Sequence, residues 1–338
     1  MKKIFPLILG LALIAACAEK GKTADDGPVV DAVVASDRVN GPVDSLTLMI
    51  HWTPQAQFAG YYMALEKGFY QEEGIKVKLV DMVHASEGDA FKSLTSGKAD
   101  LCTSLLQHAL LEKSWGSDIV NVLQVSQNTG LVLVSHKPVE SFKDLEKMRI
   151  GRWKQGFGEI ADIFYHENKL DVTPIDFTQG SNLYLCGALD ATLCEVYNEY
   201  LEILFAEGDD TQSHILKFSE LGYNYPEDAV FATKDYYEHN ASLIVRFNRA
   251  TIKGWNYARS HREETIDVVI DAMKRCNVPC NRKFQTMMLD QVLELQIDKG
   301  TGTATFSPIT EEAFNKMENQ MIAMGHFVEY IDYKDFIK

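Results

Sequence analysis

The chain has 338 residues, with 48 Asp and Glu against 33 Lys and Arg, and a formal net charge of −15 at pH 7. This acidic balance, without a cluster of Lys or Arg, argues against nucleic acid as a partner and weakly against a highly anionic ligand. Once an N-terminal leader and a polar segment are set aside, roughly 300 residues remain, which is too many for one compact core and predicts two lobes.

The first residues have the pattern of a secretory signal. Two lysines precede an apolar run over residues 4–15, which is shorter than the roughly 20 residues of a permanent membrane span. The run ends in Leu-Ile-Ala-Ala-Cys at residues 13–17, which resembles the bacterial lipobox. We predict a signal peptide over 1–16 and lipidation at Cys17; an ordinary signal that happens to contain a Cys is the alternative. The anchor would hold an exported protein on the periplasmic or cell-surface side of a membrane.

Residues 17–45 are polar and small, so they bury too little surface to offset the entropy of ordering, and we expect a flexible tether. Strands and helices then alternate from Leu46. Strands are predicted at 46–50, 75–80, 99–103, 120–125 and 131–135, and helices at 60–70, 89–96 and 105–113. No later apolar run approaches the length of a membrane span.

The alternation restarts in the middle of the chain. We predict a helix start at 141–145, strands at 149–151, 173–177 and 191–196, and helices at 158–170 and 183–189. A strand from Asp228 precedes helices at 236–261, 263–275, 282–297 and 311–324. This pattern predicts an α/β protein with two mainly parallel sheets. Lobe one is assigned to 46–135 plus 227–338, and lobe two to 136–226.

Five cysteines follow Cys17, so they cannot all pair. Cys276 and Cys280 bracket a tight turn that an oxidising compartment could close with a disulfide. Zinc is the rival interpretation, but no second Cys or His pair with ligand spacing lies nearby in the sequence. Cys186 and Cys194 could pair, or each could be a small apolar residue. We predict no metal site and no cofactor.

A resemblance to a known family is carried by one long stretch and several shorter ones. Residues 50–70 begin Ile-His-Trp-Thr-Pro-Gln and end Glu-Lys-Gly-Phe-Tyr, and Glu-Gly-Ile follows at 73–75. Further matches lie at 94–100, 141–145, 149–151, 187–191, 197–199, 254–258 and 261–265. The chain resembles ABC-transporter substrate-binding proteins related to the fungal synthase of the pyrimidine half of thiamine, which are also similar to aliphatic-sulfonate binders.

The resemblance implies a class II periplasmic-binding-protein fold with a ligand cleft between two lobes, and a membrane permease as partner. It implies pyrimidines, riboflavin-like rings or sulfonates as ligands. An enzyme is the alternative from another class, because the related synthase consumes an active-site His and a bound pyridoxal phosphate. This chain lacks the Cys-rich run of that synthase, and intracellular cofactors fit poorly with export. We therefore predict a receptor and not an enzyme.

Candidate ligand contacts in the first lobe follow predicted strands, since ligands of open α/β sheets lie beyond the carboxyl ends of the strands. Trp52 and Tyr61 could stack on a flat ring, whereas the neighbouring Tyr62 continues an apolar stripe and is expected to pack in the core. The other candidates are polar side chains that could hydrogen-bond the edge of a ring. They are Gln57, Ser104 and Gln107.

Candidates in the second lobe lie in a Gly-rich turn at 151–158 and after the strand at 191–196. Trp153 and Phe157 could form the opposite wall of a stack, or pack on the hinge. Tyr197, Asn198 and Glu199 follow the strand, and the carboxylate of Glu199 could accept charge-assisted bonds from an amino-substituted ring. A thiamine-pyrimidine precursor is therefore the favoured ligand. A riboflavin-like ring, or a sulfonate held by the turn at 151–158, stays open.

Overall fold

A computed structural model describes residues 43–84, 89–154, 158–178, 180–208, 213–326 and 329–338. The predicted signal peptide, the lipidation site Cys17 and the stacking candidate Phe157 lie outside the described residues. The predicted tether reaches residue 45, but strand β1 already begins at Asp44. None of the helices in the described part of the chain combines the length and the apolar character needed to cross a bilayer.

The first sheet has the strand order β2-β1-β3-β10-β4. Its strands are β1 (Asp44–Met49), β2 (Ile75–Val80), β3 (Leu101–Leu105), β4 (Ile119–Gln124) and β10 (Asp228–Thr233). Strand β1 pairs in parallel with β2 and β3, whereas β10 runs antiparallel to β3 and β4. One strand from late in the chain is therefore inserted between two early ones.

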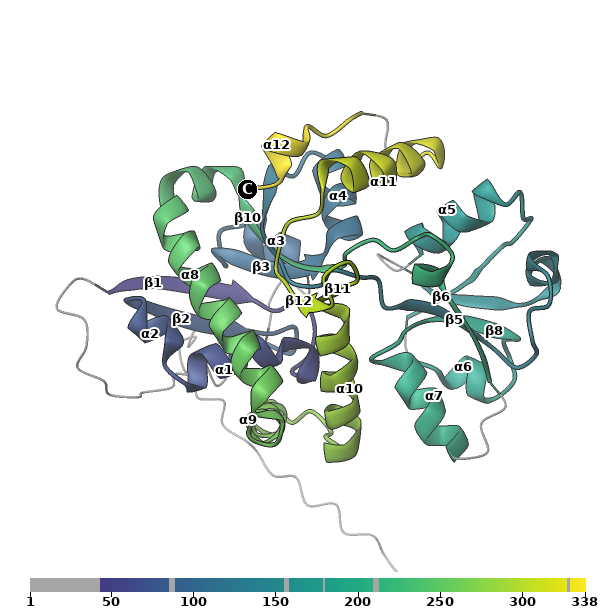
Figure 1. Cartoon of the computed structure of the whole chain (residues 1–338), viewed down its shortest axis with the longest axis horizontal. Coiled ribbons are helices and arrows are strands. Elements are labelled where there is room, and N and C mark those ends of the chain that lie inside the picture. The colour runs from purple at the N-terminus through teal and green to yellow at the C-terminus, as the bar shows by residue number, and fades with distance from the viewer. Residues whose placement is uncertain (1–42, 85–88, 155–157, 179, 209–212, 327–328) are drawn as a thin grey trace, which may run out of the picture.

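Helices cover both faces of the first sheet, because β1 sends alternate apolar side chains to opposite sides. Leu48 packs in the same buried cluster as residues of α1, α8, α9 and α10, and Met49 packs in another with residues of α3, α4 and α11. These helices are α1 (Ala59–Glu66), α3 (Ala90–Thr95), α4 (Leu106–Ser114), α8 (Lys234–Ser260), α9 (Arg262–Arg275), α10 (Arg282–Leu295) and α11 (Glu311–Ala323). Short helices α2 (Phe69–Glu72) and α12 (Tyr333–Phe336) complete this part (Figure 1).

The second sheet has the order β7-β6-β8-β5-β9 and lies beside the first (Figure 1). Its strands are β5 (Leu131–Ser135), β6 (Ile150–Trp153), β7 (Ile175–Phe177), β8 (Ala191–Glu195) and β9 (His214–Lys217). Its helices are α5 (Glu159–Glu167), α6 (Asn182–Leu185) and α7 (Glu199–Glu207). A small hairpin of β11 (Ile297–Asp298) and β12 (Thr303–Ala304) follows α10.

One predicted boundary is wrong. Residues 131–135 were assigned to lobe one, but β5 pairs antiparallel with β8 and β9 of the second sheet. The chain thus changes sheets between β4 and β5 and not after β5. The error has a simple cause: β4 and β5 are both mainly apolar and buried along their whole length, so their sequences do not reveal which sheet each strand joins.

Most predicted elements are confirmed, and the exceptions are short or half-polar. Strand β2 has the predicted bounds, whereas the predicted helix at 183–189 shrinks to α6. Helix α7 and strand β9 were not predicted. Strand β9 lies at the sheet edge, and three of its four residues are exposed, so its sequence has no clear alternation of buried and exposed residues.

Helices α1 and α8 cross at two glycines. A Cβ atom on Gly254 would lie 2.2 Å from the carbonyl oxygen of Gly60 and 2.8 Å from Ala64 of α1. A Cβ on Gly60 would overlap the ring of Trp255, with carbon atoms 2.2–2.4 Å away. The missing side chains let the two backbones approach closely. Helix α1 directly follows the segment 52–58, so this packing positions the first lobe's polar residues.

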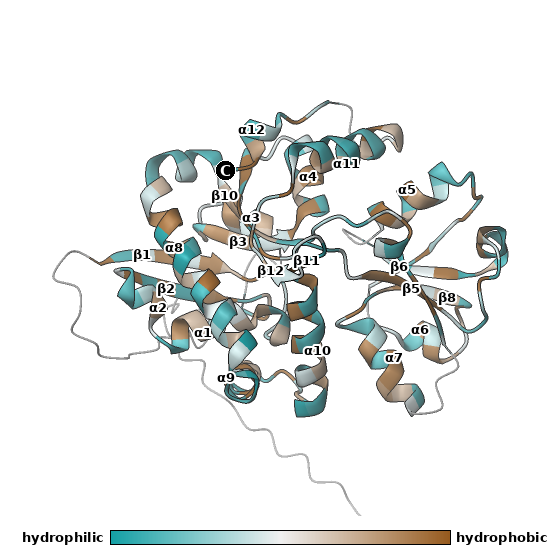
Figure 2. Ribbon diagram, in the orientation of Figure 1, coloured by the Kyte–Doolittle hydropathy of each residue, from teal (hydrophilic) through white to brown (hydrophobic). Residues whose placement is uncertain are grey.

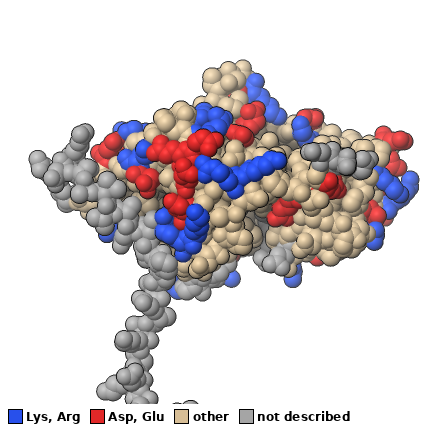
Figure 3. Space-filling model, turned by 90° about the horizontal axis from the view of Figure 1, so that it is seen from below, with Lys and Arg blue, Asp and Glu red and all other residues tan. Residues whose placement is uncertain are grey.

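The surface is polar and mixed in charge. Figure 2 shows apolar residues concentrated on the strands and on inward helix faces. On the face in Figure 3, basic and acidic side chains are interspersed over the described residues. Several basic residues of α8 are paired with acids near α2, such as Arg249 with Glu73 at 2.7 Å. Exposed pairs of this kind add little stability.

Candidate functional site: a cleft between the lobes

A cavity of about 770 Å³ separates α9 and α10 from α6 and α7. Its size is typical of a site for a small organic ligand. Both lobes contribute to its walls, through the segment after β1, the end of β6, the starts of α6 and α7, and the α9–α10 connection. The lining residues are Trp52, Thr53, Pro54, Gln55, Trp153, Gly180, Ser181, Asn182, Leu185, Asn198, Glu199, Glu202, Met273, Val278, Pro279, Cys280, Asn281, Phe284 and Gln285.

Two tryptophans meet across the cleft. Trp52 follows β1 of the first sheet, and Trp153 is the last residue of β6 in the second. Their ring centroids lie 5.8 Å apart with an interplanar angle of 88°, which is an edge-to-face contact. Trp52 stays 37 % exposed. An aromatic surface from each lobe therefore borders the cavity.

Two glutamates at the start of α7 face the cavity. One carboxylate oxygen of Glu199 accepts from the backbone N–H of Glu195 at 3.0 Å, and the other accepts from the Asn198 side chain at 2.9 Å. Burial raises the pKa of Glu199 to about 7, although these hydrogen bonds act in the opposite direction. Glu202 accepts from the Ser181 hydroxyl at 2.8 Å. The second lobe thus presents carboxyl groups that are held in place.

The charges along the cavity have one sign. Among the described residues that line it, Glu199 and Glu202 are acidic and none is Lys, Arg or His. The remaining polar side chains include two hydroxyls, a thiol and several amides, among them Gln55, Asn281 and Gln285. Gln285 accepts from the backbone N–H of Ala56 at 2.7 Å. This lining favours a neutral or cationic ligand that donates hydrogen bonds.

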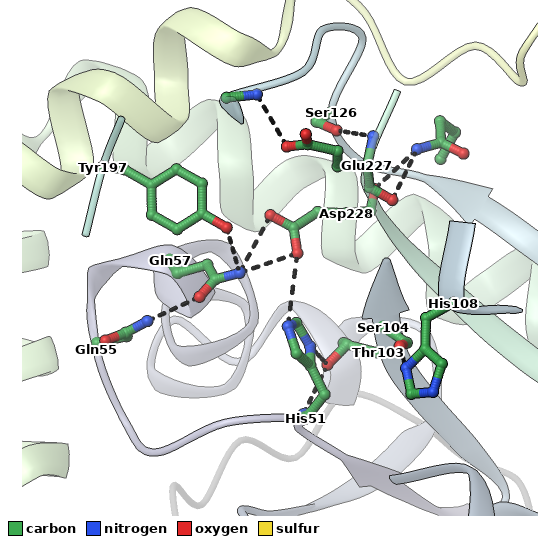
Figure 4. Close-up of polar contacts among 12 residues, drawn as sticks. His51, Gln55, Gln57, Thr103, Ser104, His108, Ser126, Tyr197, Glu227 and Asp228 are labelled. Carbon is green, nitrogen blue, oxygen red and sulfur yellow. Dashed lines mark hydrogen bonds and ion pairs between the residues drawn. The ribbon is translucent and has the colours of Figure 1, made fainter. Parts of the chain in front are cut away.

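A buried polar network lies behind the cavity wall (Figure 4). Gln55 donates to the side-chain oxygen of Gln57 at 2.7 Å, and Gln57 donates to the Tyr197 hydroxyl and to Asp228, both at 3.1 Å. Burial raises the pKa of Asp228 to about 7, and burial together with His108 lowers the pKa of His51 to about 3. His51 is thus neutral, and Gln55 is tied to the strand β10.

A second pair of carboxyl groups lies at the start of β5. Glu227 accepts from the backbone N–H of Gly130 at 2.9 Å and from the Thr129 hydroxyl. Glu195 ends β8, and its buried Oε2 atom has no hydrogen-bond partner among the described residues. Burial and the neighbouring Glu227 raise the pKa of Glu195 well above its usual range, and burial raises that of Glu227 to about 7. Burial and the nearby negative charge therefore favour the protonated form of Glu195.

Comparisons with known proteins place the chain in a family. A family model described as NMT1/THI5 like matches residues 55–265. The chain belongs to the NMT1/THI5-like family. A formylaminopyrimidine-binding protein of Halalkalibacterium halodurans is 23 % identical over 86 % of this chain and 85 % of its own length. A 4-amino-5-hydroxymethyl-2-methylpyrimidine phosphate synthase of Aspergillus parasiticus is 24 % identical over 71 % of this chain and 74 % of its own length.

Solved structures show the fold of this NMT1/THI5-like protein. The periplasmic aliphatic sulphonate binding protein SsuA of Escherichia coli superposes with a TM-score of 0.64 and 15 % identity, over 86 % of this chain and 96 % of its own. The chain therefore has the two-lobed periplasmic-binding-protein fold expected from the sequence, with the cavity at the junction of its two sheets.

The cavity of the NMT1/THI5-like protein brings together four of the predicted site residues. Trp52, Trp153, Asn198 and Glu199 all line it. Gln57 and Tyr197 lie one layer behind, where their side chains bond to each other and not to the cavity. Neither residue lines the cavity, because buried polar side chains must satisfy one another and here they do so inside the protein. A contact of either residue with ligand stays a prediction.

Three other predicted residues do not reach the cavity. Tyr61 is buried in α1, with its ring edge-on to Trp255 at 6.0 Å, because it faces α8 and not the cleft. Ser104 is buried in β3, with its hydroxyl 3.5 Å from His108. Gln107 is buried in α4 and donates to the carbonyl of Pro226 at 3.4 Å. It borders only a small cavity of about 10 Å³ beside Glu195 and Glu227, the size of one water.

Sequence reasoning missed the acidic residues nearest the crossing between lobes. Glu195 and Asp228 stand at the end of β8 and the start of β10, and a carboxylate at a strand terminus is a signal that could have been followed. Ser181, Glu202 and Asn281 were also missed. They come from α6, α7 and the α9–α10 connection, whose meeting at one cavity depends on how the two lobes pack.

The five described cysteines are free. Neither disulfide that the sequence left open is present: Cys186 is exposed at the end of α6 while Cys194 is buried in β8. Cys276 is buried, and its thiol donates to Asp81 at 3.4 Å, whereas Cys280 is exposed at the cavity. Cys186 and Cys194 do not pair because the side chain of Cys194 packs in the buried cluster with Val132 and Val134 of β5.

Proposed function

We propose that this protein is the solute-binding lipoprotein of an ABC importer, and that it captures an amino-substituted heteroaromatic ring of the thiamine-pyrimidine precursor class. The observation that carries the proposal is the lining of the cleft. It combines a tryptophan from each lobe with two carboxylates and several amides, and its described residues include no basic side chain. Aromatic faces bind flat rings, and carboxylates bind amino groups.

The protonation of Glu199 fits an aminopyrimidine. With a pKa of about 7, its carboxyl group exchanges readily between acceptor and donor at neutral pH. An aminopyrimidine edge presents an amino donor beside a ring-nitrogen acceptor, and a carboxylic acid matches that pair with its own acceptor and donor. A ring nitrogen that takes a proton would instead pair with the ionised carboxylate.

The two-lobed arrangement suits capture by closure. Ligand that touches Trp52 in one lobe and Trp153 in the other favours the state in which both contacts are made. We propose that the closed, loaded protein docks on a membrane permease. Lipid at Cys17 would hold the protein at the surface of a membrane, on the periplasmic or cell-surface side, where it meets its ligand.

A sulfonate is a poorer fit despite the likeness of fold. A sulfonate keeps its negative charge at all ordinary pH values and needs basic side chains or several free N–H groups. The described cavity lining would instead place Glu199 and Glu202 beside it, which is repulsive. The volume of about 770 Å³ would also admit a larger ring such as riboflavin, so riboflavin belongs in the test.

The test identifies the ligand and then the contacts. Mass spectrometry of the native protein shows what co-purifies. Calorimetry then compares 4-amino-5-hydroxymethyl-2-methylpyrimidine, its formylamino relative, riboflavin and taurine. We expect binding of an aminopyrimidine, weakened by about 1.5–3 kcal/mol in Glu199→Gln. Glu220→Gln, on an exposed turn outside the cavity, is the matched control.

The stacking role is tested on the second tryptophan. Trp153→Ala removes one wall and should weaken ring binding about tenfold, or about 1.4 kcal/mol. Trp115→Ala is the control, because Trp115 is 67 % exposed and lies outside the cavity. Tight taurine binding, or aminopyrimidine binding that ignores both Glu199→Gln and Trp153→Ala, would overturn the proposal.

A further inference from the structure

Three metal-ligating side chains from distant parts of the sequence meet beside the cleft. Asp81 directly follows β2, His84 comes three residues later, and Cys276 is the first residue after α9. One ligand atom from each lies within 4.8 Å of the other two. The Nδ1 atom of His84 is 3.2 Å from one Asp81 oxygen, and the Cys276 thiol is 3.4 Å from the other.

A buried tyrosine of α1 feels the charges of two of these side chains. Tyr62 is only 6 % exposed, and its buried hydroxyl has no hydrogen-bond partner among the residues that the structure describes. Burial raises the pKa of this phenol well above its usual value, and the charges of Asp81 and Cys276 raise it further. An orphaned buried hydroxyl is uncommon and indicates a missing partner.

We propose that Asp81, His84 and Cys276 form a binding site for a divalent transition-metal ion of the zinc type. The donors are one oxygen, one nitrogen and one sulfur, a mixture that suits zinc and excludes magnesium and calcium as preferred ions. Zinc takes four ligands in a tetrahedron, and water fills a fourth position.

The charges balance in the occupied site. An ionised Asp81 and the thiolate of Cys276 together neutralise a divalent cation, and His84 binds as a neutral ring. The thiol proton leaves to solvent as the sulfur–metal bond forms, and no electrons are transferred. Arg275 is the opposing charge, since it acts on the same thiol from the preceding position. Before binding, the thiol and the imidazole hydrogen-bond to Asp81; the ion replaces both bonds.

The location gives the ion a structural role. The segment after Cys276 supplies Val278, Pro279, Cys280 and Asn281 to the cavity wall. A metal bond from Cys276 to the end of β2 would fix this wall against the first sheet. The segment 81–84 is also joined to the aromatic side of the cleft, because the N–H of Met82 donates to the carbonyl of Trp52 at 3.3 Å.

Cobalt is the first probe, because it reports its ligands by absorption. The purified full-length protein is stripped with a chelator and titrated with Co²⁺. We expect one equivalent to bind with tetrahedral visible bands and a sulfur-to-cobalt charge-transfer band, and zinc to displace it. The charge-transfer band should vanish in Cys276→Ser and persist in Cys280→Ser, which changes the exposed neighbouring thiol.

Zinc affinity provides the second readout. His84→Ala changes a surface turn and leaves the buried core intact, so it stays informative if Cys276→Ser folds poorly. We expect His84→Ala to weaken zinc at least about tenfold in calorimetry, whereas His239→Ala, at an exposed position of α8, should have no effect. Zinc should also raise the melting temperature of the unaltered protein by mass action. Absence of one-to-one binding, or a cobalt spectrum unchanged by Cys276→Ser, would overturn the site.

Discussion

Gly254→Ala tests whether the close crossing of α1 and α8 holds the first lobe together. In an exposed helix, replacing Gly by Ala stabilises a protein by about 1 kcal/mol. Here the new methyl group would lie 2.2 Å from the backbone oxygen of Gly60. Backbone cannot rotate away as a flexible side chain can, so the two helices must separate. Overpacking of this kind costs about 1–3 kcal/mol, and a backbone contact places the cost at the upper end.

The net expectation is destabilisation by about 2 kcal/mol, the difference between a cost of about 3 and a propensity gain of about 1. Thermal unfolding should show a melting temperature lower by about 4 °C or more. Asn256→Ala, on the exposed face of the same helix, is the control and should be neutral or slightly stabilising. A stabilised or unchanged Gly254→Ala would show that α1 and α8 do not need this contact.

The remaining predictions concern the buried carboxyl groups and the thiols. Folding raises the pKa of Asp228 from 3.8 to about 7, so the protonated carboxyl group contributes to stability at low pH and that contribution is lost as pH rises toward 7. Asp228→Asn should reduce the fall of the unfolding free energy with pH between about 4 and 7 by up to about 1.4 kcal/mol per pH unit. An unchanged slope would refute the raised pKa of Asp228. Thr129→Val removes the hydroxyl bonded to Glu227 and should lower the free energy of unfolding in urea by about 1–3 kcal/mol, whereas no change would mean that the carboxyl group finds another donor. In the native protein a maleimide should modify the exposed Cys186 and Cys280 quickly and the buried thiols only after unfolding. Protection of both exposed cysteines would contradict their assignment as free, exposed thiols.

Local sequence signals were sufficient for regular elements and for part of the cleft. Strand β2 alternates buried and partly exposed residues and was predicted with its bounds, because period-two patterning reports burial directly. Trp52 and Glu199 follow strands, so the rule for strand ends placed them correctly at the cavity. The same rule predicted that Tyr61 would lie at the cavity, and this is wrong, since helix α1 directs that side chain toward α8. Rotation of a helix about its axis decides such cases, and it is set by packing.

Contacts between residues far apart in the chain could not be predicted from one sequence. Asn281 in the α9–α10 connection and Glu202 in α7 both line the same cavity, and nothing in their local sequence links them. The same is true of His84 and Cys276, which come together with Asp81 only when β2 and α9 are packed. The sequence spacing that excludes a zinc finger says nothing about ligands brought together by the tertiary fold.

The position of β10 beside β4 makes the second lobe a contiguous insertion into a single hairpin. These two strands are antiparallel neighbours, with Gln124 opposite Ala229, and the N–H of Val125 donates to the carbonyl of Asp228 at 2.9 Å. The chain therefore leaves the first sheet and returns to it at adjacent points. Segments whose ends are close in space can be exchanged without straining their host. A second lobe from a relative could be grafted at these two junctions alone, so that evolution could vary one wall of the cleft while keeping the other.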